Sequence, residues 1–361
     1  MATSAPPASQ QGAVRDHGFH PLRVRRVVHE TAEAASFVFE VPAELRTAFA
    51  YEAGQFLTFR APVGDEVHHR CYSMSSSPAV DDELQVTVKR VPGGVVSNWM
   101  IDTLAAGDLV DASLPAGVFC LGADGDGDLV AFSAGSGITP VFSLLKSALA
   151  TTDRRVRLYY ANRDRDAVIF AAELDALVER HPDRLEVIHH LDVERGFVDP
   201  DALRPFLGDA TGAEFFVCGP GPFMDIVEQV LLGSGVDADR IHIERFTPAE
   251  PVPAAGSAAD TGTAEGAATT TRVTIELGGR TDTVEHRAGT TILQTARQMG
   301  MSPPYSCESG SCATCMAHLV EGTVKMHVND VLTDEEVAEG WVLTCQSVPT
   351  APSVHVVYEG S

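Results

Sequence analysis

The sequence predicts three folded parts in order: an all-β domain, an α/β domain with a parallel sheet, and a small mixed domain with four spaced cysteines. Short alternating apolar runs broken by Gly and Pro fill residues 18–123. Strands alternate with helical stretches over residues 124–247, and a segment poor in core-forming residues, 248–270, separates these from residues 271–361. A chain of 361 residues suits two or three domains.

Composition and charge exclude several classes of function. The formal net charge of −24 argues against nucleic acid or an anionic membrane surface as a partner. No apolar run approaches the roughly 18–20 residues of a membrane span. Residues 1–17 lack an apolar signal-peptide region and are predicted to be a disordered tail. Seven cysteines, four of them in one pattern, fit a reducing compartment. We therefore expect a cytoplasmic protein that binds neither nucleic acid nor membrane.

The first domain is predicted to be an antiparallel barrel or sandwich, because closely spaced strand-like runs are separated by turn residues. The runs cover residues 23–28, 36–39, 55–60 and 84–90. Two segments within it are candidates for cofactor binding. They are Arg70, Cys71, Tyr72 and Ser73, and further on Gly94, Val95, Val96 and Ser97. An arginine can pair with a pyrophosphate, an aromatic ring can stack on a flat cofactor, and a serine can donate to a ring nitrogen. Taken singly, each could equally be an ordinary barrel residue.

The second domain is predicted to contain βαβ units and a parallel sheet. We expect strands at 129–132, 156–161, 185–190, 214–218 and 241–244, and helices at 140–150, 170–180 and 220–232. The segment 248–270 that follows is rich in Ala, Thr, Gly, Pro and Glu and is predicted to be a flexible linker.

Two glycine turns stand at strand ends of this domain, each leading into a helix. The first consists of Gly135, Ser136, Gly137, Ile138, Thr139 and Pro140. The second begins with Cys218, Gly219 and Pro220 and continues to Met224. Glycines let a backbone approach a pyrophosphate, and a helix N-terminus supplies free N–H groups. Either turn alone could be a plain strand-to-helix connection, but ligands of such sheets gather at the carboxyl ends of strands, so both turns indicate one crevice.

The last domain contains the spacing C-x4-C-x2-C at Cys307, Cys312 and Cys315, and Cys345 follows after 29 residues. This is the plant-type [2Fe–2S] spacing, in which four thiolates hold two irons. A structural zinc site usually pairs two short cysteine knuckles, which this sequence lacks. An odd cysteine count in a long chain argues against a disulfide framework. A helix is expected at 291–299, before the cysteine loop.

In this order the motifs resemble those of the ferredoxin–NADP reductase superfamily, and the C-terminal cysteine domain narrows the resemblance to reductase components of bacterial oxygenases. The resemblance covers about residues 23–358 without the linker, and residues 51–58, 70–73, 86–90, 134–140, 160–164, 218–224 and 328–332 carry it. It implies an FAD-binding Greek-key barrel, an NAD(P)-binding domain and a β-grasp ferredoxin domain. Within the family it is closest to the reductases of 3-ketosteroid 9α-hydroxylation.

The resemblance also implies roles for individual residues. Arg70 is expected at the FAD pyrophosphate, Tyr72 at the flavin and Ser73 at flavin N5, with Cys71 between them in a structural role. The backbone of Val88 and Lys89 is expected at the flavin edge, and that of Gly94, Val95, Val96 and Ser97 at the pyrophosphate. The nicotinamide dinucleotide is expected along residues 135–140, Asn162, Arg163 and the second glycine turn. Ser73, Cys218 and Glu244 are the expected catalytic residues, and Phe246 is expected near the flavin.

A flavin accepts two electrons as a hydride and releases them singly, so the expected path runs from NADH through FAD and [2Fe–2S] to a Rieske-type oxygenase. Related reductases serve phenylacetyl-CoA epoxidation and other ring hydroxylations, so the final substrate stays open. Asp164 and Asp166 alternate with Arg163 and Arg165 and favour NADH over NADPH.

Two other classes of protein remain open: a flavin or nitric-oxide-type reductase, and a non-catalytic metal-binding scaffold. We expect a monomer. Residues 271–361 contain 11 acidic and 5 basic residues, which is consistent with a basic acceptor or with solvation alone.

Overall fold

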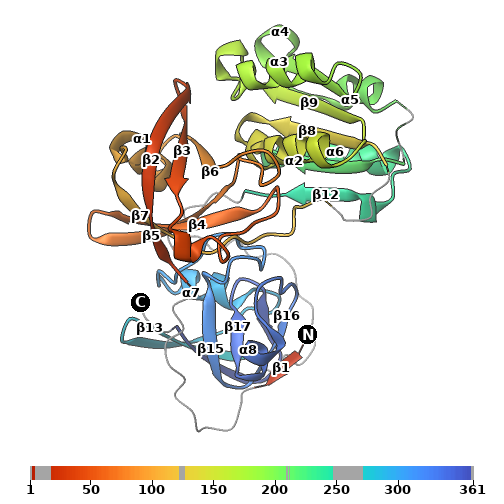
Figure 1. Cartoon of the computed structure of the whole chain (residues 1–361). Helices are drawn as coiled ribbons and strands as arrows, with labels where there is room; N and C mark the ends of the chain where they lie inside the picture. Colours follow the sequence, from red (N-terminus) through yellow and green to blue (C-terminus); the bar gives the residue numbers. More distant parts are fainter. Residues whose placement is uncertain are drawn as a thin grey trace. The chain divides into compact units, whose positions relative to one another are not determined.

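The computed structural model describes residues 2–4, 18–121, 127–208, 210, 212–246 and 271–358. These residues form two compact units (Figure 1). One unit spans Phe19–Phe246, and the other comprises residues 271–358 with the N-terminal strand β1 (Ala2–Ser4). The predicted linker and all of the predicted tail except residues 2–4 lie outside the described residues. No helix among the described residues is long and apolar enough to cross a membrane.

The first half of the larger unit is an antiparallel barrel, as the sequence predicts. Its sheet has the Greek-key order β5-β4-β7-β2-β3-β6, and a bridge between Met74 and Val86 joins the two edge strands. Alternate strand residues such as Leu22 and Val24 fill its core. The strands are β2 (His20–Thr31), β3 (Ala34–Glu40), β4 (Phe56–Val63), β5 (Glu66–Ser73), β6 (Leu84–Lys89) and β7 (Leu109–Ala112). A short helix, η1 (Ala43–Leu45), follows β3, and α1 (Val95–Thr103) follows β6.

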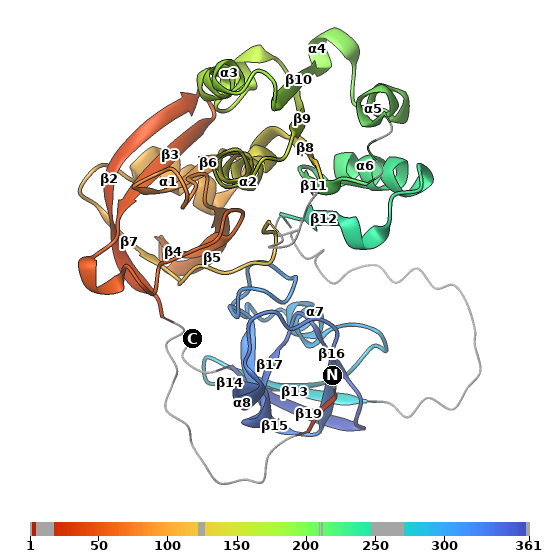
Figure 2. The ribbon, with the colours of Figure 1, turned by 45° about the vertical axis from the view of Figure 1, so that its right-hand side comes forward.

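The second half is a five-stranded parallel sheet in the order β10-β9-β8-β11-β12. The strands are β8 (Leu129–Ala134), β9 (Val156–Asn162), β10 (Leu185–Leu191), β11 (Glu214–Cys218) and β12 (Ile241–Glu244). The helices are η2 (Gly135–Gly137), α2 (Ile138–Thr151), η3 (Arg165–Ala167), α3 (Ala171–Arg180), α4 (Asp192–Arg195), α5 (Pro200–Leu207), α6 (Gly221–Gly233) and η4 (Ala238–Arg240). Residues of α2 and α3 share one buried cluster with the sheet, and residues of α5 and α6 share another. Helices therefore cover both faces of the sheet (Figure 2).

A polar seam joins the barrel to α2 inside this unit. The Ser77 and Ser147 hydroxyls lie 2.6 Å apart, the Ser143 hydroxyl donates to the Ser76 carbonyl at 2.5 Å, and Lys146 forms an ion pair with Asp81. The four serines are buried, so their polar groups need these partners across the seam. The seam places β6 of the barrel beside the first glycine turn of the sheet.

The smaller unit has a five-stranded sheet in the order β14-β13-β19-β15-β17, in which helix α7 (Ile292–Gln298) contributes Ile292, Leu293 and Ala296 to the core. This is the β-grasp fold that the resemblance implies. The remaining elements are β13 (Arg272–Leu277), β14 (Arg280–Glu285), β15 (Met316–Glu321), β16 (Thr323–Met326), α8 (Asp334–Ala338), β17 (Trp341–Leu343), β18 (Ser347–Pro349) and β19 (Ser353–Val357).

Strand β1 pairs with β16 in an antiparallel sheet, with Thr3 opposite Val324. At residues 2–4 the structure therefore differs from the predicted disordered tail. An edge strand offers unpaired main-chain groups, so even a short segment without apolar patterning can pair with it.

Candidate cofactor and electron-transfer sites

The two glycine turns of the parallel sheet lie in direct contact. A Cβ atom added to Gly137 would fall 2.1 Å from the carbonyl oxygen of Cys218 and 2.7 Å from the nitrogen of Gly219. Gly135 has φ of +54°, a conformation that favours glycine. The sheet order explains the contact, because β8 and β11 are neighbours and each turn follows the carboxyl end of its strand. Both turns thus border one crevice, at the point where the strand order reverses.

The N-terminus of helix α2 borders this crevice, where an anion could bind. Its first residues Ile138, Thr139 and Pro140 are buried, and the Thr139 hydroxyl donates to the Ser136 carbonyl at 3.1 Å. The Tyr160 hydroxyl donates to the Gly135 carbonyl at 3.1 Å, which anchors the turn to β9. The Ile138 N–H donates to the Gly135 and Ser136 carbonyls, and Pro140 has no N–H. A pyrophosphate here would therefore depend on the remaining N–H groups of the turn and on the positive end of the helix dipole.

A lysine from the barrel also reaches this turn. The Lys89 ammonium lies 3.4 Å from the position that a Cβ atom of Gly135 would take. Burial lowers the pKa of Lys89, and the neighbouring carboxylates of Glu33 and Asp164 oppose that shift. The sequence analysis expects only the backbone of Lys89 to contact a cofactor, at the flavin edge. The position of its ammonium beside the pyrophosphate turn depends on the tertiary contact between barrel and sheet.

Cys218 and Glu244 end neighbouring strands and face each other in the β11–β12 register. The Cys218 side chain is fully buried, and burial, followed by the nearby Glu244 carboxylate, raises the pKa of its thiol. The thiol is therefore neutral and can pack or donate weakly, but it is not a nucleophile. Phe246 follows β12 and is 36% exposed.

The predicted flavin segment occupies the last four residues of β5. Ser73 is 1% exposed, and its hydroxyl oxygen has no hydrogen-bond partner within the described part of the chain. Such a buried hydroxyl is costly unless a ligand satisfies it, so it fits the expected donor to a flavin ring. Burial raises the pKa of Tyr72, which keeps the phenol neutral. The Cys71 thiol lies 3.3 Å from the Thr58 hydroxyl, in agreement with a structural role.

The second flavin segment forms the start of helix α1. Gly94 is the residue before the helix, and the Ser97 hydroxyl accepts a hydrogen bond from the Val91 backbone at 3.1 Å. The Asn98 amide donates to the Gly94 carbonyl at 2.6 Å. A Cβ atom on Gly94 would meet the Ser97 oxygen at 2.8 Å. The backbone here is held tightly, and the first N–H groups of a helix have no acceptor inside it, as a pyrophosphate site needs.

In the loop after β9, where the coenzyme is expected, carboxylates balance the charge of an arginine. Asn162 is buried at the strand end, and Arg163 follows it with 63% of its side chain exposed. The Arg163 Nε atom donates to Asp164 at 2.8 Å, and a second carboxylate, Glu33 of the barrel, lies 3.8 Å from its Nη1 atom. Sequence reasoning missed Glu33, because no local signal connects it with a residue 130 positions later.

The four cysteines form two neighbouring pairs. The Cys312 sulfur accepts from the Cys307 backbone N–H at 3.5 Å, and a hydrogen bond between the two side chains, followed by burial, raises the pKa of the Cys307 thiol. A hydrogen bond with Cys345, followed by burial, likewise raises the pKa of Cys315. Within the described ranges, no group of three or more His, Cys, Asp or Glu side chains has an arrangement that could hold a metal ion. Two pairs of thiols suit a cluster with two irons and four thiolates.

The backbone of the cysteine loop points toward sulfur. The N–H groups of Ser309 and Ser311 both donate to the Cys307 sulfur at 3.4 Å. Glu308 and Ala313 have positive φ values of 52° and 55°, which are uncommon outside glycine and mark a constrained loop. N–H donation to cluster sulfurs is one of the means by which a protein sets a reduction potential. The residues present therefore fit the [2Fe–2S] group.

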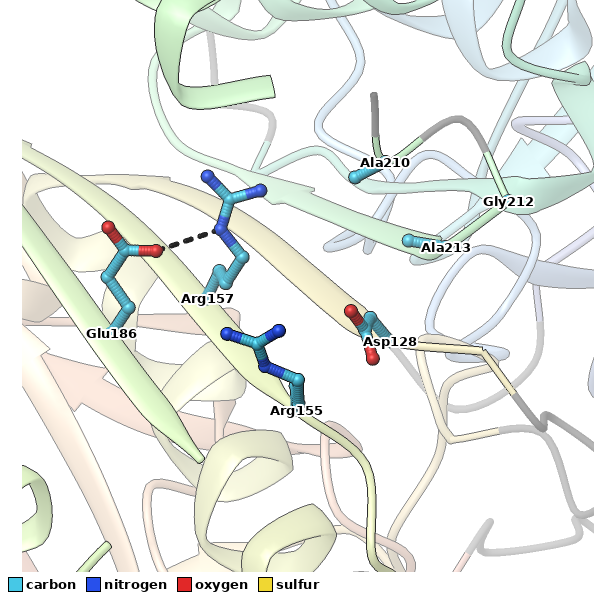
Figure 3. Close-up of a pocket in the computed structure, with 7 residues that line it drawn as sticks. All are labelled: Asp128, Arg155, Arg157, Glu186, Ala210, Gly212 and Ala213. Atoms are coloured by element: carbon cyan, nitrogen blue, oxygen red, sulfur yellow. Dashed lines mark hydrogen bonds and ion pairs between the residues drawn. The ribbon is translucent and has the colours of Figure 1, made fainter. Parts of the chain in front are cut away.

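A surface pocket of about 470 Å³ lies elsewhere, at the amino ends of the sheet strands (Figure 3). The Arg157 Nε atom donates to Glu186 at 2.9 Å and its guanidinium lies 4.5 Å above the Phe206 ring. These partners hold Arg157 in a structural role. The pocket is lined by Asp128, Arg155, Arg157, Glu186, Ala210, Gly212 and Ala213. It is at the opposite end of the sheet from the glycine turns.

Comparisons with known proteins match the chain to three domain families. Family models match in succession: an oxidoreductase FAD-binding domain at residues 21–120, an oxidoreductase NAD-binding domain at 132–229, and a 2Fe-2S iron-sulfur cluster binding domain at 275–350. The ferredoxin reductase component of 3-ketosteroid-9-alpha-monooxygenase from Rhodococcus rhodochrous is 42% identical over 339 residues, 93% of this chain and 96% of the relative. One component of the 1,2-phenylacetyl-CoA epoxidase from Escherichia coli is 31% identical over 94% of this chain and 98% of its own.

Among solved structures, phthalate dioxygenase reductase aligns with 95% of this chain and 99% of its own, at a TM-score of 0.59 and 26% identity. The order of barrel, nucleotide domain and cysteine domain is thus common to the chain and its relatives. The chain belongs to the family of oxygenase reductase components and is an iron–sulfur flavoprotein oxidoreductase that transfers electrons by way of FAD, NAD and 2Fe–2S domains.

Proposed function

We propose that this protein takes electrons from NADH and delivers them to a Rieske-type oxygenase that hydroxylates a steroid ring, in the manner of 3-ketosteroid 9α-hydroxylation. The 42% identity to a 3-ketosteroid-9-alpha-monooxygenase reductase component over nearly the whole chain carries the proposal for the substrate system. The abutting glycine turns, the unpaired Ser73 hydroxyl and the paired cysteines support the electron path. Rieske centres have potentials of about −150 mV and above, against roughly −400 mV for plant-type clusters, so the acceptor favours forward transfer.

The residues of this chain bind and orient the reacting groups. The flavin, when bound, supplies the exchange between a hydride and single electrons. Arg70 and the start of α1 would hold its pyrophosphate, and the Ser73 hydroxyl would donate to its ring. Residues 135–140 and 218–224 would hold the coenzyme, and Glu244 and Phe246 would help to position the nicotinamide and the flavin. Cys218 shapes the nicotinamide pocket as a neutral, buried thiol.

The path has a direct kinetic test. Anaerobic stopped-flow mixing of the cluster-loaded protein with NADH is expected to bleach the flavin absorbance first and the cluster absorbance afterwards. Flavin bleaching with a cluster that never changes would contradict the path. Reconstitution with a 3-ketosteroid oxygenase is expected to give hydroxylated product. Product only with a phenylacetyl-CoA epoxidase would assign the chain to that system instead, to which the 31% identity relates it.

We propose NADH as the coenzyme because Arg163, one of two arginines in the loop after β9, is already neutralised, and Asp164 and Asp166 alternate with the two arginines. Arg163 is paired with Asp164 and lies near Glu33, so it is poorly placed to attract a 2′-phosphate. The Asp164 carboxylate would also repel that phosphate. The Arg163 guanidinium holds the pKa of Asp164 below its ordinary value, so this carboxylate stays charged at neutral pH.

Replacement of Asp164 tests the coenzyme choice. Asp164→Asn keeps an oxygen that can accept from the Ala167 N–H, now at 2.9 Å, and so preserves the local cap. The variant is expected to raise the ratio of kcat/KM for NADPH over NADH roughly five- to tenfold, since one repulsive charge is removed. Asp201→Asn, which removes an equal charge from an exposed carboxylate paired with Arg204 on helix α5, is the matched control and is expected to leave the ratio unchanged. A wild-type protein that prefers NADPH would overturn the proposal.

We further propose that the protein acts as a cytoplasmic monomer. All seven cysteines are unbridged in the structure, which supports a reducing compartment. Light scattering of the loaded protein is expected to give a mass near 38.4 kDa. A mass of twice that value would contradict the monomer.

A further inference from the structure

A salt bridge pins the cysteine loop to helix α7. The Arg297 Nη1 atom lies 3.2 Å from one carboxylate oxygen of Glu308 and 3.4 Å from the other. The Arg297 guanidinium also lies 4.7 Å above the Tyr305 ring. Only 14% of the Arg297 side chain and 21% of the Glu308 side chain are exposed, so water screens this pair less than an ordinary surface pair.

The backbone at Glu308 has an uncommon conformation and is held by several hydrogen bonds of the loop. It follows the ligand Cys307 directly, and its φ of 52° turns the chain so that the next N–H, that of Ser309, meets the Cys307 sulfur. The Gln346 amide holds the Glu308 carbonyl at 2.7 Å. Farther along, the Asp330 N–H donates to the Gly310 carbonyl at 3.1 Å. The loop is therefore fixed through its carbonyls by Gln346 and Asp330 and through a side chain by Arg297.

From this geometry we propose that the Arg297–Glu308 pair sets the reduction potential of the [2Fe–2S] cluster by balancing a carboxylate next to a ligand with a partly buried guanidinium. Reduction adds one negative charge to the cluster. The Glu308 carboxylate opposes that charge and Arg297 favours it, and their mutual contact keeps the Ser309 peptide aimed at sulfur. Arg297 and Glu308 are thus positioning residues for the electron-transfer function proposed above, on which this inference rests.

The test is a potentiometric titration of the full-length, cluster-loaded protein with dithionite and mediators, followed by the electron paramagnetic resonance signal of the reduced cluster. Arg297→Gln is expected to make the cluster harder to reduce, by up to about tenfold in the reduction equilibrium, which is about 59 mV for one electron. Glu308→Gln, which keeps an oxygen for Arg297, is expected to shift the equilibrium by a similar factor in the opposite direction. Arg297→Lys keeps the charge and is expected to recover most of the wild-type potential.

Arg280→Gln is the matched control, because it removes an arginine of the same domain that is paired with Asp282 on the β13–β14 hairpin. Iron and sulfide content confirm that each variant holds its cluster. Opposite shifts for Arg297→Gln and Glu308→Gln, with no shift for Arg280→Gln, support the proposal. Shifts of one sign in both variants, no shift in either, or an equal shift in the control would overturn it. Because dithionite replaces NADH, a failure here is distinct from a failure of NADH-driven transfer.

Discussion

Ser73 has the clearest cofactor-dependent position among the flavin residues. Its hydroxyl is buried and has no partner within the described part of the chain, so the free protein bears a desolvation cost that a bound flavin would remove. A core serine with satisfied bonds behaves differently. Ser113 accepts from the Thr58 N–H and donates to the Leu114 carbonyl, both at 2.9 Å.

Ser73→Ala is therefore expected to weaken FAD binding about tenfold, the equivalent of about 1.4 kcal/mol, and to leave the flavin-free protein no less stable. Ser113→Ala is expected to do the reverse, with a stability loss of about 1 kcal/mol and an unchanged FAD affinity. Fluorescence titration of the flavin-free protein and chemical unfolding measure the two quantities. A Ser73→Ala protein that binds FAD as the wild type does would remove Ser73 from the site.

At the scale of elements, the contact between the two strand-end turns is the feature that builds the coenzyme crevice. Gly137 leaves no room for a side chain, because its Cβ would meet the rigid backbone of Cys218 and Gly219. Gly221, in the second turn and at the start of α6, has nothing within 4 Å of its added Cβ. The two glycines thus belong to one crevice, but only Gly221 has room for a side chain.

Gly137→Ala is expected to destabilise the larger unit by about 3 kcal/mol, a fall of roughly 6–12 °C in Tm, and to raise the KM for NADH. Gly221→Ala is expected to be neutral or slightly stabilising, since alanine is favoured over glycine in a helix. Thermal unfolding and steady-state kinetics of both variants test the pair. A Gly137→Ala protein with wild-type Tm and KM would show that the turns do not meet in solution.

At the scale of the whole molecule, barrel and sheet form one unit while the cysteine domain forms another. The buried serine seam and the Lys146–Asp81 pair tie the barrel to α2, so these two domains should unfold together. The cysteine domain has its own core, to which Ile292, Trp341 and Val354 contribute.

Calorimetry is accordingly expected to show two transitions. FAD at about 100 times its dissociation constant should stabilise one of them by about 2.7 kcal/mol, and removal of the cluster should lower the other. Separate scans with and without each cofactor check the assignment. A single transition that shifts with both cofactors would show that the units unfold as one.

Much of this architecture was predictable because it depends on patterns of residues that are close together in the sequence. The cysteine spacing, the alternation of strands and helices, and the glycine turns are short-range patterns whose meaning does not depend on distant residues. Helices α1, α5 and α8 were not predicted. They are short, from five to nine residues, which makes an apolar period hard to recognise. The start signals of α5 (Asp199 before Pro200) and α8 (Thr333 with Glu336) are present in the sequence, whereas α1 begins without a side-chain cap.

The sequence by itself determined the kinds of cofactor, the order of the domains and the segments expected to bind each cofactor, since backbone turns and thiol ligands are encoded by adjacent residues. Only the tertiary structure decided which groups meet across the fold. Gly137 against Cys218, Glu33 near Arg163, Lys89 over Gly135 and Arg297 on Glu308 all join residues of different elements. Their charges and clearances depend on packing, and packing is a property of the whole chain.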